Sequence, residues 1–334
     1  MTRTLERPAE TLERPAETLE PSAETLDPPP PLVPTLTSAQ RQELARRHGL
    51  RPVGVRPSLW AYTRDVLSRA AFIRVLGTAT AYSRNQHTYL GQLWALLNPV
   101  LNATVYVLIF GIILRTGRGV ENTVAFIVIG VFLFRFVEQS VHGGAQSIAR
   151  RVDLLRSLRF PRAVLPIANV TSHLATLAPA LGVMCLVVLG SGLLPGVDPV
   201  RVTPQWLLLL PAVALLGTFT LGVAFVMARL AAVMPDLNNV IPFVLRFVMY
   251  GSGVIFPVVH YAERLPDAVG SWVAPVLELQ PVAVYLYLGR SALMDEEAFV
   301  QEPVLWAFGV VWAVVSLVGG FVVFWRGEQT YGRD

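Results

Sequence analysis

Repeated apolar runs of about twenty residues are the feature that most restricts the fold of this 334-residue chain. Each run is long enough to cross the hydrocarbon core of a bilayer as a helix. Only 15% of the residues are charged, whereas soluble domains carry about 25%. The pattern predicts an all-α polytopic membrane protein with six transmembrane helices, at 93–114, 123–143, 164–190, 206–230, 240–260 and 304–325.

A further apolar segment lies between the fifth and sixth runs, at 272–293. It is long enough to cross a membrane, but it contains Pro275, Glu278, Gln280 and Pro281. Proline breaks a helix because it lacks an N–H donor and clashes with the preceding turn. We therefore expect two short re-entrant helices in the outer leaflet rather than a seventh span.

The region 58–90, just before the first run, has a helical pattern of a different kind. Its apolar residues recur at intervals of three and four, which places them on one face, and arginines lie beside and opposite that face. An amphipathic, arginine-bearing helix next to a span is typical of a helix that lies on the bilayer surface. We expect 58–90 to form such an interfacial helix region.

The chain begins with a degenerate seven-residue repeat, TLERPAE, within 1–37. Every unit contains proline, which costs about 3 kcal/mol inside a helix, so the repeat is unsuited to a coiled coil. We interpret 1–37 as a disordered tail rich in proline and glutamate, and 38–57 as a cytoplasmic segment. The remaining 91–334 forms the transmembrane domain.

The stretch RRVDLLRSLRFPR, between the second and third runs, carries five arginines and one acidic residue. Arginines also precede the first run, whereas the segment between the fifth and sixth runs is acidic. Basic loops stay on the cytoplasmic side of a membrane. The sequence thus predicts a multi-pass protein of the plasma membrane with both termini in the cytoplasm.

The chain has no lysine, and all 27 of its basic residues are arginine. A phosphate-binding loop of the GxxxxGK[ST] kind needs a lysine to reach the outer phosphates of a nucleotide. The chain is therefore not a conventional P-loop ATPase. If ATP drives its activity, a separate subunit binds and hydrolyses the nucleotide.

Polar side chains inside the first, second and fifth runs are the candidate functional residues of the membrane interior. They recur at helical intervals, so each run has one polar face. One interpretation is a hydrophilic translocation pathway, and the other is helix packing through interhelical hydrogen bonds. The chain has no catalytic constellation and no metal-ligand spacing. The pathway candidates are Asn98, Asn102, Tyr106, Arg135, Glu138, Gln139, Arg246 and Tyr250.

Four motifs occur in an order that resembles a known family. They are YSRNQHTYLGQLWALLNPVL, LLRSLRFPRAVLP, MPDLNNVIPFVLRFVMYGSGVIFP and LELQPVAVYLYLGRSAL. Together they resemble the membrane subunit of ABC-2 type exporters. The resemblance is to the branch that exports lipid-linked polysaccharides such as O-antigens, teichoic acids and mycobacterial-type galactan. One departure is Gln280–Pro281, where the family usually has asparagine and proline.

This resemblance implies a permease subunit that forms a homodimer and works with two copies of a separate ABC ATPase, which binds ATP and Mg. The chain itself would hold no cofactor and bind no nucleic acid. It implies contact with membrane lipids and with a polyprenyl-diphosphate-linked glycan, whose diphosphate would meet Arg69, Arg74 and Arg84 on uptake. The residues that would couple the chain to the ATPase are Arg150, Arg151, Asp153, Leu154, Arg156, Pro235 and Asp236.

Two other functions fit parts of the sequence. One is a membrane-embedded glycosyltransferase or ligase that acts on the same lipid carrier, which would need positioned acids in a polar catalytic loop. The other is an ABC-2 efflux permease for drugs or small lipids. The motif order favours the polysaccharide exporter.

Overall fold

The structure is a computed structural model that describes residues 37–48, 57–84, 89–91, 93–114, 119–158, 160–195, 197–257 and 266–328. The chain divides into two units, Met1–Val53 and Gly54–Asp334. The described part of the first unit is α1 (Ser38–Arg47), an exposed helix with an ion pair between Arg47 and Glu43. Apart from Thr37, the predicted tail 1–37 lies outside the described residues.

Five segments of the second unit are helical, long and apolar enough to cross a membrane. They match five of the six predicted spans to within three residues at each end. The described residues contain no strand, so the prediction of an all-α fold is confirmed. The segments are α4 (Leu93–Tyr106) with the π-helical η1 (Val107–Ile113), α5 (Thr123–Ala145), α7 (Val164–Ser191), η3 (Pro204–Leu208) with α8 (Leu209–Val233), and α13 (Pro303–Arg326).

The predicted fifth span, 240–260, corresponds to a shorter helix. α9 (Leu237–Gly251) has 15 residues and is followed by a turn in which Gly253 has a φ of 72°. That left-handed conformation suits glycine and ends the helix. Because 258–265 lies outside the described residues, a sixth crossing stays a prediction.

The segment between α9 and α13 forms two helices, as the prolines predict. α11 (Asp267–Leu279) and α12 (Pro281–Leu293) meet at Gln280, whose ψ of 144° is extended. Pro281 favours this extended backbone in the residue before it and suits the first turn of a helix. The position of the pair within a bilayer stays a prediction.

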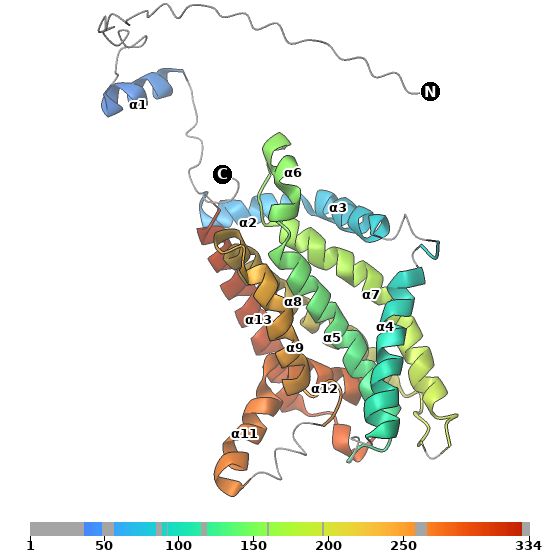
Figure 1. Ribbon diagram of the computed structural model, residues 1–334. Helices are drawn as coiled ribbons and strands as arrows, with labels where there is room; N and C mark the ends of the chain where they lie inside the picture. The colour runs from blue at the N-terminus through green and yellow to red at the C-terminus, as the bar shows by residue number, and fades with distance from the viewer. Residues whose placement is uncertain are drawn as a thin grey trace, which may run out of the picture. The chain divides into compact units, whose positions relative to one another are not determined.

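The region before the first span is a broken helix. α2 (Leu59–Ser68) and α3 (Ala70–Ser83) lie across one end of the helix bundle, separated by Arg69 (Figure 1). The apolar face was predicted at Leu59, Tyr62, Val66, Ala70 and Ile73. Of these residues, Tyr62, Val66 and Ile73 are buried, whereas Leu59 and Ala70 are exposed. At Gly77, α3 comes so close to α7 that an added Cβ would lie 3.0 Å from the carbonyl oxygen of Ala168. The short α6 (Val152–Ser157) projects from this same end (Figure 1).

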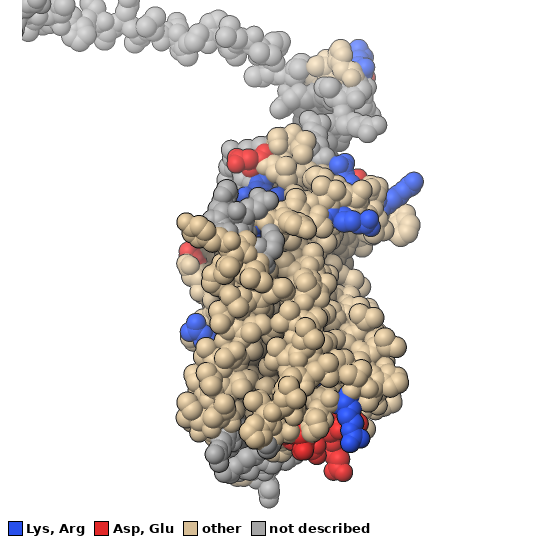
Figure 2. Space-filling model, turned by 90° about the vertical axis from the view of Figure 1, so that its right-hand side faces the viewer, with Lys and Arg blue, Asp and Glu red and all other residues tan. Residues whose placement is uncertain are grey.

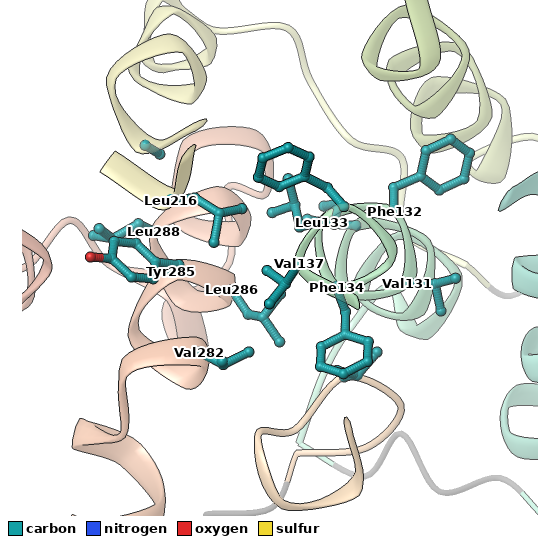
Figure 3. Close-up of a cluster of buried hydrophobic side chains, with 14 of the residues drawn as sticks. Val131, Phe132, Leu133, Phe134, Val137, Leu216, Val282, Tyr285, Leu286 and Leu288 are labelled. Carbon is teal, nitrogen blue, oxygen red and sulfur yellow. The ribbon is translucent and has the colours of Figure 1, made fainter. Parts of the chain in front are cut away.

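α5 is the centre of the second unit. It packs against α7, α8 and α12, and sixteen of its residues are buried. Figure 3 shows Leu133 and Val137 of α5 facing Leu216 of α8 and Leu286 of α12, whereas Phe132 points to the other side of α5. Because lipid is as apolar as these side chains, the helices associate mainly through close packing rather than through the hydrophobic effect.

α8 and α13 have the closest backbone contact in the described bundle. An added Cβ at Gly222 would lie 2.2 Å from the carbonyl of Ser316, and one at Gly320 would lie 2.1 Å from the carbonyl oxygen of Gly222. The Ser316 hydroxyl also donates a hydrogen bond to the carbonyl oxygen of Phe219, at 2.9 Å. Small residues permit such an approach between membrane helices.

Charged side chains gather at the two ends of the second unit. In Figure 2 most arginines lie at the end that carries α2 and α3, where some acidic atoms also lie, and a group of acidic residues with a basic side chain beside it lies at the opposite end. The acidic group consists of Glu121, Asp198, Asp295 and Glu296, with Arg201 beside them. The apolar middle and the opposite charges of the ends agree with the orientation that the loop charges predict.

Candidate functional site

A polar face interrupts the apolar surface of α5. Arg135 and Glu138, one helical turn apart, form an ion pair in which Nη1 lies 2.6 Å from Oε2. Each side chain is 37% exposed, while the neighbouring Phe134, Phe136 and Val137 are buried. The sequence predicted this polar face.

One side of this face borders a cavity between α3, α4, α5 and α7, which we call the inner cavity. Its polar walls include Arg84, Asn98, Arg135, Gln139 and His173. Asn98 and Gln139, predicted from different runs, therefore meet at one cavity. Aromatic residues complete the wall: Trp94, Phe132 and Phe136.

Arg84 brings a second cation to the inner cavity. Although the residue as a whole is exposed, its guanidinium lies 2.9 and 3.0 Å from the two ring nitrogens of the buried His173. Arginine only donates, so His173 must offer a lone pair and is neutral in this arrangement. Burial, and then the positive charges of Arg150 and Arg151, lower the pKa of the Arg84 guanidinium from its ordinary value.

The other side of the polar face borders a second cavity, between α4, α5 and α9, which we call the central cavity. Asn102, Tyr106, Arg135, Glu138 and Arg246 line it. Arg135 therefore belongs to both cavities and forms the wall between them. Seven of the eight predicted pathway residues thus line one cavity or the other, and the eighth, Tyr250, is exposed on α9 one turn after Arg246.

The three arginines predicted to meet a lipid diphosphate are not brought together. Arg69 lies at the break between α2 and α3, where its Nε is 3.5 Å from Asp65 Oδ1. Arg74 is exposed on α3. Among the three, Arg84 alone lines the inner cavity.

The predicted coupling residues lie on α6, on the turn before it and on the turn between α8 and α9. Asp153 of α6 and Pro235 and Asp236 of the second turn are exposed, and Leu154 is half-buried. Arg150 is exposed, but Arg151 points back into the molecule and donates to Thr80 Oγ1 of α3, at 2.6 Å. The side chain of Arg156 lies outside the described residues.

A polar junction that the sequence analysis missed joins α2, α13 and the segment before α7. The Tyr62 hydroxyl donates to Glu328 Oε2 at 2.6 Å and accepts the N–H of Ala163 at 3.0 Å. The N–H of Arg162 donates to Glu328 Oε1 at 3.1 Å, and its guanidinium donates to the Glu328 carbonyl. Burial raises the pKa of the Glu328 carboxyl, despite these hydrogen bonds to it. The signal in the sequence was an acid just after the last span.

A second missed residue is Arg290, which is 4% exposed on α12. It is the one charged residue in the apolar run VAVYLYLGRSAL. A lone charge in such a run is a functional signal by itself, so sequence reasoning had the means to find it.

Comparison with known proteins gives relatives of one kind. No protein-family model matches the chain. The O-antigen export system permease protein RfbA of Myxococcus xanthus is 28% identical over 242 residues, which cover 64% of this chain and 87% of that protein. Two Klebsiella pneumoniae proteins of the same name are 25% and 23% identical, each over 70% of this chain and 85% of the relative. The resemblance to ABC-2 type permeases of the polysaccharide branch, stated from the motifs, is confirmed, and the relatives favour O-antigen export within it.

Proposed function

We propose that the chain is the transmembrane subunit of an ATP-driven ABC exporter that moves a lipid-linked polysaccharide across the plasma membrane, from the cytoplasmic to the outer side. The observation that carries this proposal is the polar face shared by α4, α5 and α9, which lies between two cavities. The named relatives, which are O-antigen export permeases, support the same substrate class.

The polar face carries charged side chains, and their cost in hydrocarbon excludes a position of this face against the lipid of the bilayer. An arginine or acidic side chain at the bilayer centre costs about 2.5 to 3.5 kcal/mol on insertion scales. Arg135 and Glu138 are each 37% exposed, and Arg246 is exposed on the facing helix. Such groups belong in a water-filled path, where their donors and acceptors replace water around the hydroxyls of a passing glycan.

A second copy of the chain supplies the rest of that path. α4 and α9 leave long apolar side chains exposed beside their polar ones, including Leu101, Val105 and Phe247. One chain therefore encloses the central cavity on one side only. A homodimer that joins two such flanks would enclose the polar groups of both copies.

The end that carries α6 is the docking end for a separate ABC ATPase. The homodimer as a whole binds two copies of it. α6 and the turn at Pro235 and Asp236 present exposed backbone and side chains there. Because the chain has no lysine, ATP and Mg belong to the partner subunit, and the permease contributes no cofactor and no catalysis of its own.

The inner cavity is suited to take up the lipid carrier. Its two cations, Arg84 and Arg135, match a diphosphate. An apolar groove between α3, α4 and α7 continues from it, with Tyr82, Leu96 and Pro179 in its walls, and shares Ala81, Ala95 and Thr176 with the cavity. A polyprenyl chain would lie in the groove while its diphosphate lies in the cavity.

The proposed topology has six crossings, with α9 and the residues after it as the fifth, and both termini in the cytoplasm. α2 and α3 lie on the inner bilayer surface, and α11 and α12 dip into the outer leaflet. Single cysteines test this arrangement in a Cys185→Ser background. Membrane-impermeant reagents should label Gly119→Cys and Glu297→Cys in intact cells, but not Ser157→Cys or Gly332→Cys.

The direct test of function replaces Arg135 with alanine in the host. Surface polysaccharide should fall more than tenfold, and lipid-linked glycan should accumulate inside the cell. Arg201→Ala, which removes an exposed cation from an outer loop, is the matched control and should export normally. Unchanged surface polysaccharide in Arg135→Ala, with the protein present in the membrane, would contradict the proposal.

A further inference from the structure

Arg290 connects three elements at the acidic end of the molecule. Its Nε and Nη2 donate to the carbonyl oxygen of Phe126 on α5, at 3.3 and 3.2 Å. Nη2 also donates to the carbonyl oxygens of Gly253 and Val254, at 2.8 and 3.1 Å, in the turn after α9. The guanidinium carbon lies 3.5 Å from the centre of the Phe126 ring, which stabilises the charge further.

Glycines make room for this arrangement. At Gly130 an added Cβ would lie 2.5 Å from the carbonyl oxygen of Val254 and 2.6 Å from Arg290 Nη2. Gly253 has a left-handed φ, which sets the path of the turn after α9. The carbonyl oxygens of this turn accept hydrogen bonds from Arg290. The position of the guanidinium is therefore fixed from several sides.

One nitrogen of Arg290 remains available. Among the described residues, Nη1 has no hydrogen-bond partner, and Arg290 lines a cavity bounded by α5, α11, α12 and the turn after α9. Ser252 lines the same cavity, is 4% exposed, and has a hydroxyl without a partner in the described part of the chain. Buried polar groups ordinarily find partners, so the Ser252 hydroxyl points to a polar ligand, and Arg290 Nη1 can donate to one of its oxygen atoms.

The rest of the cavity wall is mostly apolar, and three of its residues are aromatic. Phe126, Tyr287 and Phe299 line it, with ring centres 5.9 Å apart for Phe126 and Phe299 and 5.7 Å apart for Tyr287 and Phe299. Glu278 is a further polar residue of the wall. The wall thus combines ring surface with a donor, a hydroxyl and a carboxylate.

We propose that this outer cavity binds one sugar ring of the glycan as it leaves the exporter. A sugar ring has apolar C–H faces that pack against aromatic rings and hydroxyls that both donate and accept. A phosphate would meet the Glu278 carboxylate and a mostly apolar wall, and a hydrocarbon would leave the Ser252 hydroxyl and Arg290 Nη1 without partners. The inference rests on the proposed function, since it assigns a contact of the same exported polysaccharide.

The test uses the full-length chain in nanodiscs and a panel of methyl glycosides as probes. Saturation-transfer NMR should detect binding of at least one glycoside. Ala298→Trp, which fills the cavity from an exposed position in its wall, should reduce that signal at least fivefold. Val304→Trp, which adds the same side chain at a residue that is 62% exposed and outside the wall, should leave it unchanged. Arg290 itself is left intact, because it holds three elements together.

Three results would overturn the inference: no glycoside signal, a signal that Ala298→Trp does not reduce, or binding of inorganic phosphate in place of glycosides. Ser252→Ala provides a second measure, since it removes the hydroxyl without adding bulk and should weaken binding several-fold. Surface polysaccharide is measured in the same strains. Export by the wild type without glycoside binding would remove this inference alone, whereas a wild type that exports no polysaccharide would remove the proposed function.

Discussion

Two of the membrane-length segments are equally apolar in sequence and lie in opposite surroundings. In the most apolar 18-residue stretch of α5, 78% of the residues are buried, against 11% in the α4–η1 segment. α5 is enclosed by α7, α8 and α12, whereas α4 lies at the edge of the bundle (Figure 1). The polar pathway residues lie where these two kinds of helix meet. We call α5, the helices α7, α8 and α12 packed around it, and α13 packed against α8 the scaffold, and the exposed side that carries α4 and α9 the open flank. The comparison shows that one chain forms a complete scaffold and leaves this flank exposed.

The two regions also differ in their backbones. α4 contains Pro99 and continues as the π-helical η1, and α9 contains Pro242. Proline and π-helical turns weaken or widen the regular hydrogen-bond ladder and are common where helices bend. The scaffold side also contains a proline inside a helix, Pro179 of α7, but it has the close contact of α8 with α13. We expect rigidity on the scaffold side and movement on the flank that carries α4 and α9.

The largest effect is expected within the scaffold. Gly320→Ala would place a methyl group 2.1 Å from the backbone of Gly222, and a backbone atom cannot turn aside as a flexible side chain can. Folded protein in detergent, measured by size-exclusion chromatography, should fall more than tenfold. Gly319→Ala is the matched control, because its added Cβ meets nothing within 4 Å. Equal yields of the two variants would show that the scaffold is not rigid at this contact.

The next effect belongs to the open flank and should separate export from folding. Glu138→Ala leaves Arg135 without its ion-pair partner, so the charge of the path changes while the scaffold stays packed. Export should fall about tenfold, with little change in the thermal unfolding temperature. Glu138→Gln retains a hydrogen-bond acceptor and should lose less export. A large drop in unfolding temperature would mean that the polar face holds helices together instead, the alternative left open by the sequence.

A smaller effect is expected at the junction of α2 with α13. Tyr62→Phe removes the hydroxyl that donates to Glu328 and accepts from Ala163. Leaving buried polar groups unpaired costs about 1 to 3 kcal/mol each, so the free energy of unfolding should fall by an amount in this range. Tyr89→Phe, at a fully exposed tyrosine, is the control and should change nothing. The same stability in both variants would show that α2 is not tied to the scaffold through this hydroxyl.

The smallest effect is a dependence on pH. Because the folded-state pKa of Glu328 is raised by burial, the folded protein keeps a proton that the unfolded chain has lost. The stabilisation is therefore complete below the ordinary carboxyl pKa and is lost as the pH rises through the raised one. The wild type should lose stability relative to Glu328→Gln over that interval, measured by thermal unfolding at stepped pH. A constant difference between the two proteins across the interval would contradict the assignment.

The sequence predicted the helices well because their causes are local. Apolar runs, the break before Pro281 and the polar spacing of Arg135 with Glu138 are all properties of neighbouring residues. The sequence could not rank α5 above α4, since lipid and protein interior favour the same side chains. Nor could it find the contact of Arg84 with His173 or that of Tyr62 with Glu328, because these partners are distant in the chain. The sequence predicted a fifth span at 240–260, but the described helix at this position, α9, ends at Gly251.

The backbone contact of α8 with α13 has a consequence for biosynthesis. α13 leaves the ribosome after α9, α11 and α12, so α8 must stay in the membrane with its glycine surface uncovered until α13 has been made. A nascent chain that stops before α13 would expose that groove to lipid and to membrane proteases. The quality-control machinery of the cell would thus meet every copy that lacks α13 as an unfinished bundle, which couples survival of the protein to synthesis of α13.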